Sequence, residues 1–324
     1  MSSKSTETAV SSTAVSFQEV REEQEGQRLD NFLVSRLKGV PKSRIYRLIR
    51  KGEVRVNKKR VKPEYKLKTA DLVRIPPIRI AERAARQAPS EDLQALINNS
   101  VLHEDADLLV LNKLSGLPVH GGTGVKTGLI EALRSMKPEE SDLELAHRLD
   151  KGTSGCLLIA KHPKALKLLS EQFKTGHINK TYHALVQGSW PAHLGEINAA
   201  LQRQEPQGGE RFVSVSKEGK HALTRFRILE KLPDATLVEA CPVTGRTHQI
   251  RVHAQLAGYP IIGDEKYSEP APRKAFSRQG IKRLCLHAAV LSFVHPVSGD
   301  RLTVKAPYDS QFEAAIRVLR QARD

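Results

Sequence analysis

The sequence contains few cysteines, few aromatic residues and no long apolar run. Its 324 residues include three cysteines (Cys156, Cys241 and Cys285), an odd number set far apart, so neither a disulfide framework nor a zinc cluster is expected. No apolar stretch approaches the roughly 20 residues that span a bilayer, and the Ser/Thr-rich start lacks the apolar core of a signal peptide. We therefore expect a cytoplasmic protein with no membrane segment and a disordered tail over residues 1–20.

Acidic residues are scarce in one segment, where the positive charge of the chain is concentrated. The formal net charge is +16, and between Arg28 and Arg74 sixteen basic residues stand against four acids, a net +12. Such a charge density calls for a polyanionic partner, either nucleic acid or an anionic membrane surface. The apolar face that a membrane-binding helix would need is required here for a core, which favours nucleic acid. A basic surface that only aids solubility is the alternative.

The same segment has the pattern of a small domain with two helices and a short sheet. Apolar residues recur at helical spacing in residues 29–37 and stop at Gly39, and Ser43 is expected to cap a second helix. Short strands are expected within residues 53–57 and 71–76. The basic side chains of the second helix and the adjoining turn are expected to form one RNA-binding surface: Lys42, Arg44, Arg47, Arg50, Lys51, Lys58, Lys59 and Arg60.

The order of these elements resembles the RNA-binding domain first described in ribosomal protein S4. We assign this small α/β domain to residues 21–76, a linker to residues 77–92 and a second domain to residues 93–324. In the second domain β-rich runs outnumber helical stretches and do not alternate regularly with them. This predicts an α+β fold with a mixed, mostly antiparallel sheet. Helices are expected at residues 127–136, 164–174, 248–256 and 310–321.

One acid, Asp150, stands in the motif HRLDKGTSG, just before a predicted buried strand. A loop at the mouth of a sheet is a common position for a catalytic group, although Asp is also frequent as a turn residue. A second motif, TGRTHQIRVHAQLAG, predicts a buried helix with a polar stripe formed by Thr247, Arg251 and Gln255. Buried polar side chains need partners, so Arg251 could pair with Asp150 and keep that carboxylate ionised.

Five motifs in this chain resemble, in order, those of the RluA family of pseudouridine synthases. They are LLVLNKLSGLPVH, HRLDKGTSG, KTYHALV, TGRTHQIRVHAQLAGYPIIGDEKY and LHAAVLSFVHP. The resemblance implies a pseudouridine synthase fold, with Asp150 as the catalytic carboxylate and Arg251 as its salt-bridge partner. It also implies that Tyr182 stacks on the target base and that Arg148 enters the RNA where the uridine leaves. Three further residues are expected to contribute to substrate binding: His147, Thr153 and Arg246.

Two of these motifs leave local alternatives open. Taken alone, a tyrosine in a strand, such as Tyr182, is more often a half-buried residue of the core than a functional residue. Leu114 stands where the family usually has a proline, a departure that removes a rigid turn residue but none of the chemical groups. His120 and His248 are expected to be hydrogen-bonded structural residues, and no metal site is expected because the histidines lack compact ligand spacing.

The implied reaction breaks the N1–C1′ bond of a uridine, rotates the uracil and rejoins it through C5. There is no redox step, so no cofactor is expected. An ionised carboxylate near the ribose could act as a nucleophile at C1′ or as a base at C2′, and the sequence leaves both open. The target base must leave the RNA stack at a cost of a few kcal/mol, which an inserted side chain and stacking partly offset.

The basic front domain and the resemblance favour large-subunit ribosomal RNA as the substrate. Transfer RNA is the alternative within the family. A non-catalytic RNA-binding or ribosome-assembly protein is the main competing class. A glycosidase-like hydrolase is less well supported, since such enzymes usually use two carboxylates. A monomer is expected because the chemical groups can be assembled within one chain.

Overall fold

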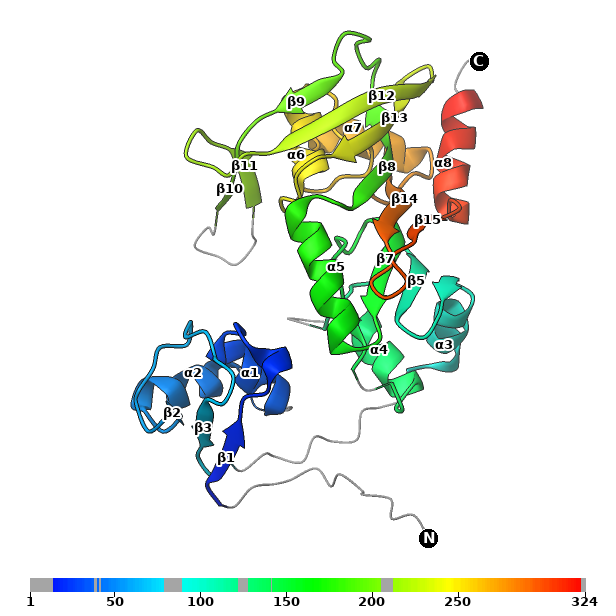
Figure 1. The fold of residues 1–324 in the computed structure, drawn as a ribbon. Helices are drawn as coiled ribbons and strands as arrows, with labels where there is room; N and C mark the ends of the chain where they lie inside the picture. The colour runs from blue at the N-terminus through cyan, green and yellow to red at the C-terminus, as the bar shows by residue number, and fades with distance from the viewer. Residues whose placement is uncertain are drawn as a thin grey trace. The chain divides into compact units, whose positions relative to one another are not determined.

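The computed structural model describes residues 14–37, 40, 42–78, 89–121, 128–140, 142–204 and 212–321. The chain divides into two compact units, Met1–Gln87 and Ala88–Asp324 (Figure 1). None of the described helices is long and apolar enough to cross a membrane. Each unit has its own hydrophobic core, so the two are described separately.

The first unit packs two helices on a three-stranded antiparallel sheet of order β1-β3-β2. The apolar residues that recur at helical spacing in the sequence, such as Phe32 and Ile45, are buried between the helices and the sheet. The elements are β1 (Ser16–Glu19), a 3-10 turn at Glu22–Gln24, α1 (Leu29–Arg36), α2 (Lys42–Lys51), β2 (Arg55–Val56) and β3 (Leu72–Ile75).

Two local predictions in this unit are wrong. Residues Ser16–Glu19 form strand β1, paired with β3 from Ser16↔Ile75 to Glu19↔Leu72, so the expected disordered tail does not extend to residue 20. This strand has little apolar character because it is held in place by backbone hydrogen bonds to the edge of β3, rather than by burial of its side chains. Helix α2 begins at Lys42, which places Ser43 inside the helix and not at its cap. Gly39 and residues 1–13 lie outside the described residues.

The second unit is built on a ten-stranded sheet in which every pair is antiparallel except β7–β14. The expected mixed, mostly antiparallel α+β architecture is therefore confirmed. Along the sheet the order is β4-β5-β7-β14-β8-β13-β12-β9, with β15 on β14 and β6 on β7. The strands are β4 (Val101–Glu104), β5 (Leu108–Lys113), β6 (Glu144–Leu145), β7 (Ser154–Ala160), β8 (Asn179–Gln187), β9 (Glu196–Asn198), β12 (Leu223–Lys231), β13 (Ala235–Pro242), β14 (Leu286–Val294) and β15 (Arg301–Lys305); β10 (Leu201–Gln204) and β11 (Phe212–Val215) form a separate hairpin.

Six helices of the described chain accompany this sheet. Four lie where apolar periodicity predicts them, although Thr127, at the start of one prediction, is outside the described residues. A fifth, α3, begins inside the expected linker, capped by the Ser90 side chain, which accepts from the backbone of Leu93. The sixth, α7, was not predicted, because the prolines at its start resemble a turn. The helices are α3 (Glu91–Asn98), α4 (Leu129–Met136), α5 (Pro163–Thr175), α6 (Gln249–Leu256), α7 (Pro270–Arg278) and α8 (Ser310–Gln321).

The centre of the sheet brings the sequence motifs together. Strand β7 meets β14 so closely that a Cβ on Gly155 would lie 2.3 Å from the carbonyl oxygen of Ala288, and Gly155 has φ +105°. Only glycine fits both conditions. On the other side of β14 lies β8, where Tyr182 is in register with Ala288 and with Ala240 of β13. The Asp150 loop, β8 and the segment leading into α6 therefore meet at one place.

Candidate active site

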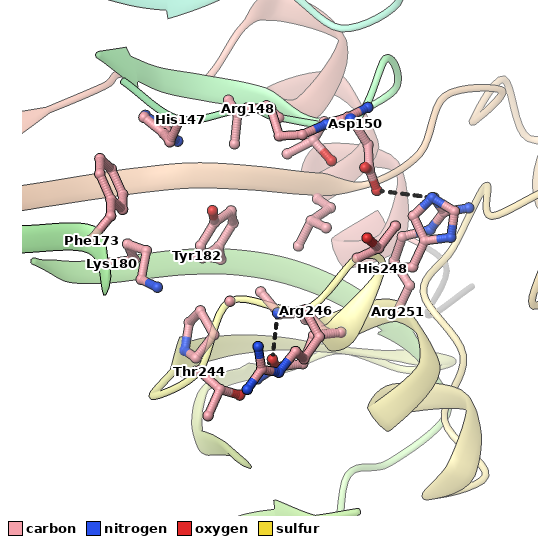
Figure 2. Close-up of a pocket in the computed structure, with 18 of the residues that line it drawn as sticks. His147, Arg148, Asp150, Phe173, Lys180, Tyr182, Thr244, Arg246, His248 and Arg251 are labelled. Atoms are coloured by element: carbon pink, nitrogen blue, oxygen red, sulfur yellow. Dashed lines mark hydrogen bonds and ion pairs between the residues drawn. The ribbon is translucent and has the colours of Figure 1, made fainter. Parts of the chain in front are cut away.

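A cavity of about 340 Å³ lies where these three segments meet (Figure 2). Its walls come from the HRLD loop, strand β8, the end of α5 and the segment from Pro242 to Arg251. All seven catalytic and substrate-binding residues predicted for this domain line it: His147, Arg148, Asp150, Thr153, Tyr182, Arg246 and Arg251. The individual roles given to these residues remain predictions.

Asp150 is fixed by an arginine that is itself buried. Arg251, in α6, donates from Nη1 to Asp150 Oδ2 at 3.1 Å, and from Nε and Nη2 to the two carboxylate oxygens of Asp264, each at 2.7 Å. The two carboxylates hold the pKa of Arg251 above its usual value despite burial. Asp264 therefore orients the guanidinium in a bidentate geometry, and the remaining nitrogen faces Asp150.

His248 approaches the same oxygen of Asp150 as Arg251 does, with 3.6 Å between Nε2 and Oδ2. It has a left-handed backbone, φ 54° and ψ 17°, immediately before α6. The Tyr267 hydroxyl accepts from the backbone N–H of Val213 at 3.0 Å and can donate to His248 Nδ1 at 2.8 Å. This network leaves the hydrogen on Nε2, directed at Asp150. Burial lowers the pKa of His248 against the opposing effect of Asp150, so a neutral ring is favoured.

The loop that carries Asp150 rests on a buried lysine. Lys113 donates from Nζ to the carbonyl oxygens of Leu114, Leu117 and Lys151, at 2.8, 2.9 and 3.1 Å. Burial lowers the pKa of Lys113 to about 7. Leu114, the departure from the family's proline, thus contributes its carbonyl to this anchor, and the loop keeps a defined support without the rigid residue.

Aromatic rings line the other end of the cavity. The rings of His147 and Phe173 lie 4.8 Å apart, and Tyr182 and Lys180 project from β8 toward the same space (Figure 2). Burial raises the pKa of Tyr182, with a further contribution from the Asp150 carboxylate, so the phenol stays neutral. A neutral aromatic ring next to a carboxylate is suited to stacking on a flipped base.

Histidine 147 is part of the structural support. Its Nε2 accepts from the backbone N–H of Leu158 at 3.0 Å, and burial, with a smaller effect of the Lys180 ammonium, lowers its pKa to about 3. Between pH 6.5, the usual pKa, and about pH 3, the His147 side chain is therefore protonated in the unfolded chain but neutral in the folded chain. The free energy of unfolding therefore decreases as the pH falls through that range.

His147→Gln should remove this part of the pH dependence, because the amide oxygen of glutamine can accept the same hydrogen bond but does not take up a proton. Urea unfolding at several pH values measures the effect. An unchanged pH dependence would contradict the assignment to His147.

The segment before α6 forms a hydrogen-bonded turn. Gln249 Oε1 accepts from the Thr244 hydroxyl at 2.7 Å and from the backbone N–H of Arg246 at 3.0 Å. Arg246 Nε donates to the carbonyl oxygen of His221 at 3.0 Å, while its side chain remains exposed. Arg148 is exposed as well, and Thr153 is buried. Two cations thus stand where the cavity meets solvent.

In the first unit, the predicted RNA-binding surface is largely accessible. Seven of its eight basic residues are exposed, and Arg44 is half-buried. The turn after β2 is joined to the end of α2, because Arg60 Nη2 donates to the carbonyl oxygen of Lys51 at 3.2 Å. The buried side of the same helix holds Ile45, Leu48 and Ile49, so the basic side chains face away from the core.

One group of potential metal ligands occurs among the described residues: Asp105, Asp107 and His295. Backbone N–H groups of Val297 and Ser298 donate to His295 Nδ1, which leaves the hydrogen on Nε2, the nitrogen directed at Asp105. A metal would need a lone pair on that nitrogen. We therefore interpret these three side chains as a hydrogen-bonded cluster outside the cavity.

The residues of the site that were missed in the sequence include Phe173, Lys180, Asp264 and Tyr267. Lys180 precedes Tyr182 by two positions, so strand periodicity alone places it on the same face. Asp264 stands in the motif GDEKY, but nothing in the sequence indicates that it contacts Arg251. Phe173 and Tyr267 belong to other elements, and their proximity to the site depends on the tertiary fold.

Similarity to known proteins covers both units. Residues 107–256 match the model of the family described as RNA pseudouridylate synthase, and residues 27–73 match the S4 domain. The chain is 52% identical to ribosomal large subunit pseudouridine synthase C of Haemophilus influenzae over 94% of this chain and 95% of the relative. It is also 52% identical to the protein of that name from Escherichia coli K12, over 92% and 94%. A solved structure, human RNA pseudouridylate synthase domain containing 4, superposes with a TM-score of 0.57 at 26% identity, covering 71% of this chain and 96% of that one.

Proposed function

We propose that this chain, which belongs to the RluA family of pseudouridine synthases, converts uridines of large-subunit ribosomal RNA into pseudouridine. The observation that carries the proposal is the position of Asp150, the one acid among the described residues that line the cavity, held at 3.1 Å from Arg251. A single ionised carboxylate beside a stacking tyrosine fits a reaction at C1′ of a flipped nucleotide. Relatives of this chain carry the name ribosomal large subunit pseudouridine synthase C.

Each side chain has a defined part in the proposed reaction. Tyr182 stacks on the extruded uracil, and Arg148, exposed beside the cavity, fills the space that the uridine leaves. Asp150 then faces the sugar, as nucleophile at C1′ or as base at C2′. Arg251 orients the carboxylate through its hydrogen bond, while His248 offers it a second N–H. His147, Thr153 and Arg246 shape the cavity.

The choice of substrate rests on the first unit and on the names of the relatives. Its exposed basic surface supports binding to a folded RNA through phosphate contacts. One chain carries every catalytic and substrate-binding residue predicted for the cavity, which supports a monomer. Ribosomal RNA as substrate supports a cytoplasmic location. We also propose that residues 21–76 form the RNA-binding domain, although β1 extends its sheet toward the N-terminus.

Tritium release from RNA labelled at uridine C5 tests the function, because the reaction exchanges the C5 hydrogen for a bond to C1′. The wild-type chain should release tritium from unmodified large-subunit ribosomal RNA and not from transfer RNA. Release from transfer RNA alone would assign the second substrate class. Release from neither would contradict the proposed function.

Neutralising the basic surface of the first unit should weaken RNA binding and reduce its salt dependence. For Lys58→Gln with Lys59→Gln, the slope of log affinity against log salt should become less negative by about 0.7 to 0.9 for each phosphate that is no longer neutralised. The rate at saturating RNA should be unchanged. Lys231→Gln with Lys305→Gln, exposed lysines of the second unit, gives the same charge change as a control. Equal effects of the two variants would contradict a specific role for this surface.

A further inference from the structure

Lys180 is a cation in the cavity for which the fold supplies no counter-charge. It is half-buried, and burial is the cause that lowers its pKa from the usual 10.5. Within the described part of the chain, no hydrogen bond or ion pair joins its ammonium to a carboxylate. The one acid among the described cavity residues, Asp150, is bound by Arg251. Burying an unpaired charge costs free energy, so such a group is retained where a ligand completes it.

Lys180 lies on the same strand as Tyr182, the residue proposed to stack on the base. Lys180 and Tyr182 are two residues apart on β8 and therefore face the same side of the sheet. A Cβ placed on Gly245 would lie 3.9 Å from Lys180 Nζ, so the ammonium is near the turn before α6. In Figure 2 the Tyr182 ring lies between Lys180 and Asp150.

We propose that Lys180 is a catalytic residue, an inference that rests on the proposed function. Its ammonium donates a hydrogen bond to the uracil carbonyl opposite the glycosidic bond and stabilises the detached uracil anion. With the base stacked on Tyr182 and its sugar at Asp150, the edge opposite the sugar lies on the Lys180 side. In uridine the ring atom opposite N1 is C4, so the acceptor is O4.

The symmetry of uracil makes one donor sufficient for both halves of the reaction. When the N1–C1′ bond breaks, its electron pair stays on the uracil and spreads over N1, O2 and O4. Rotation about the N3–C6 axis exchanges N1 with C5 and O4 with O2. The atom opposite C5 is C2, so Lys180 then meets O2. The C5–C1′ bond forms with electrons of the uracil ring, C5 loses its hydrogen as a proton and N1 gains a proton. Lys180 remains an ammonium throughout.

A phosphate of the RNA is the other anion that a lysine could bind. Arg148 and Arg246 are exposed and open to phosphate, whereas Lys180 is half-buried next to the base-stacking ring. This contrast favours a contact of Lys180 with the base over a contact with an RNA phosphate. Loss of a contact made in the transition state lowers the rate at saturating enzyme, whereas loss of a phosphate contact weakens RNA binding.

Single-turnover kinetics of Lys180→Met and Lys180→Arg, with thermal unfolding, test the proposal. Lys180→Met should lower the rate at saturating enzyme by about 100-fold, the size expected for one donor to a developing anion, with little change in RNA affinity. Its Tm should not fall, because an unpaired half-buried charge is removed. Lys180→Arg should keep more activity than Lys180→Met. Lys174→Met, an exposed lysine near the end of α5 paired with Glu171 at 3.3 Å, is the control and should retain the wild-type rate.

Replacing O4 of the target uridine by sulfur adds an atom-specific test. The thio substitution should slow the wild type and have little further effect on Lys180→Met, because both changes remove the same hydrogen bond. Additive effects, weaker RNA binding with an unchanged saturated rate, or a lower Tm of Lys180→Met would each overturn the proposal. Absence of tritium release by the wild type would overturn the proposed function, whereas equal release by the wild type and Lys180→Met overturns the role of Lys180 alone.

Discussion

Asp150→Asn should slow tritium release by at least about 100-fold while leaving RNA binding and folding intact. Asparagine keeps a carbonyl oxygen that can accept from Arg251 but loses the negative charge and the basicity. If Asp150 is a base at C2′, the single-turnover rate should fall by about 10² to 10⁴. If it is a nucleophile at C1′, the fall should reach about 10⁶. The size of the loss therefore separates two mechanisms that the structure leaves equally accessible.

Affinity and stability measured on the same protein make this result interpretable. The apparent Kd for large-subunit ribosomal RNA should change by less than about threefold, since one removed carboxylate among many phosphate contacts affects binding weakly. Arg251 keeps its bidentate pair with Asp264, so the unfolding midpoint should also stay near that of the wild type. Retained tritium release by Asp150→Asn would show that another group carries the reaction.

Asp264→Ala should be among the most destabilising single substitutions in this chain. The Asp264 side chain is fully buried and accepts from Arg251 twice and from the backbone N–H groups of Lys266 and Tyr267. Without Asp264, Arg251 keeps only Asp150 as a partner among the described carboxylates, and the N–H groups of Lys266 and Tyr267 lose their acceptor. Breaking a buried ion pair in this way costs about 3 to 5 kcal/mol in the free energy of unfolding. Urea unfolding followed by circular dichroism measures this cost.

The adjacent acid provides the matched control. Glu265 is exposed, and Glu265→Gln should change the free energy of unfolding by less than about 0.5 kcal/mol. Asp264→Ala should also reduce activity, because the guanidinium of Arg251 then has no second carboxylate to orient it toward Asp150. Similar stability of the two variants would show that the Arg251–Asp264 pair is not a main support of the site.

The positions of the catalytic segments could be predicted because their residues are near one another in the sequence or recur at the spacing of a helix or strand. The motif HRLDKGTSG precedes a run of apolar residues that becomes β7, and the apolar periodicity after Thr247 becomes α6. Both patterns are local, so the loop position of Asp150 and the buried position of Arg251 follow from them. Their pairing at 3.1 Å was expected because a buried arginine needs an anion.

Other parts of the molecule depend on contacts that no local pattern encodes. Strand β1 pairs through its backbone with β3, and its side chains alternate between half-buried and exposed without an apolar signal. Helix α7 begins with prolines, which also occur in turns. Asp264 is 13 residues after Arg251, and only the fold of the intervening chain joins them. His147 lines the cavity, and no local pattern indicates that its Nε2 accepts from the backbone N–H of Leu158.

Nucleoside analysis of treated RNA tests the central claim most directly. Unmodified large-subunit ribosomal RNA is incubated with the wild-type chain or with Asp150→Asn, digested to nucleosides and separated by chromatography with mass detection. We expect wild-type protein to produce pseudouridine, with the mass of uridine and a different retention, and Asp150→Asn to produce at most about 1% as much in the same time. Unchanged uridine after treatment with the wild type, or pseudouridine formed equally by both proteins, would contradict the proposed reaction.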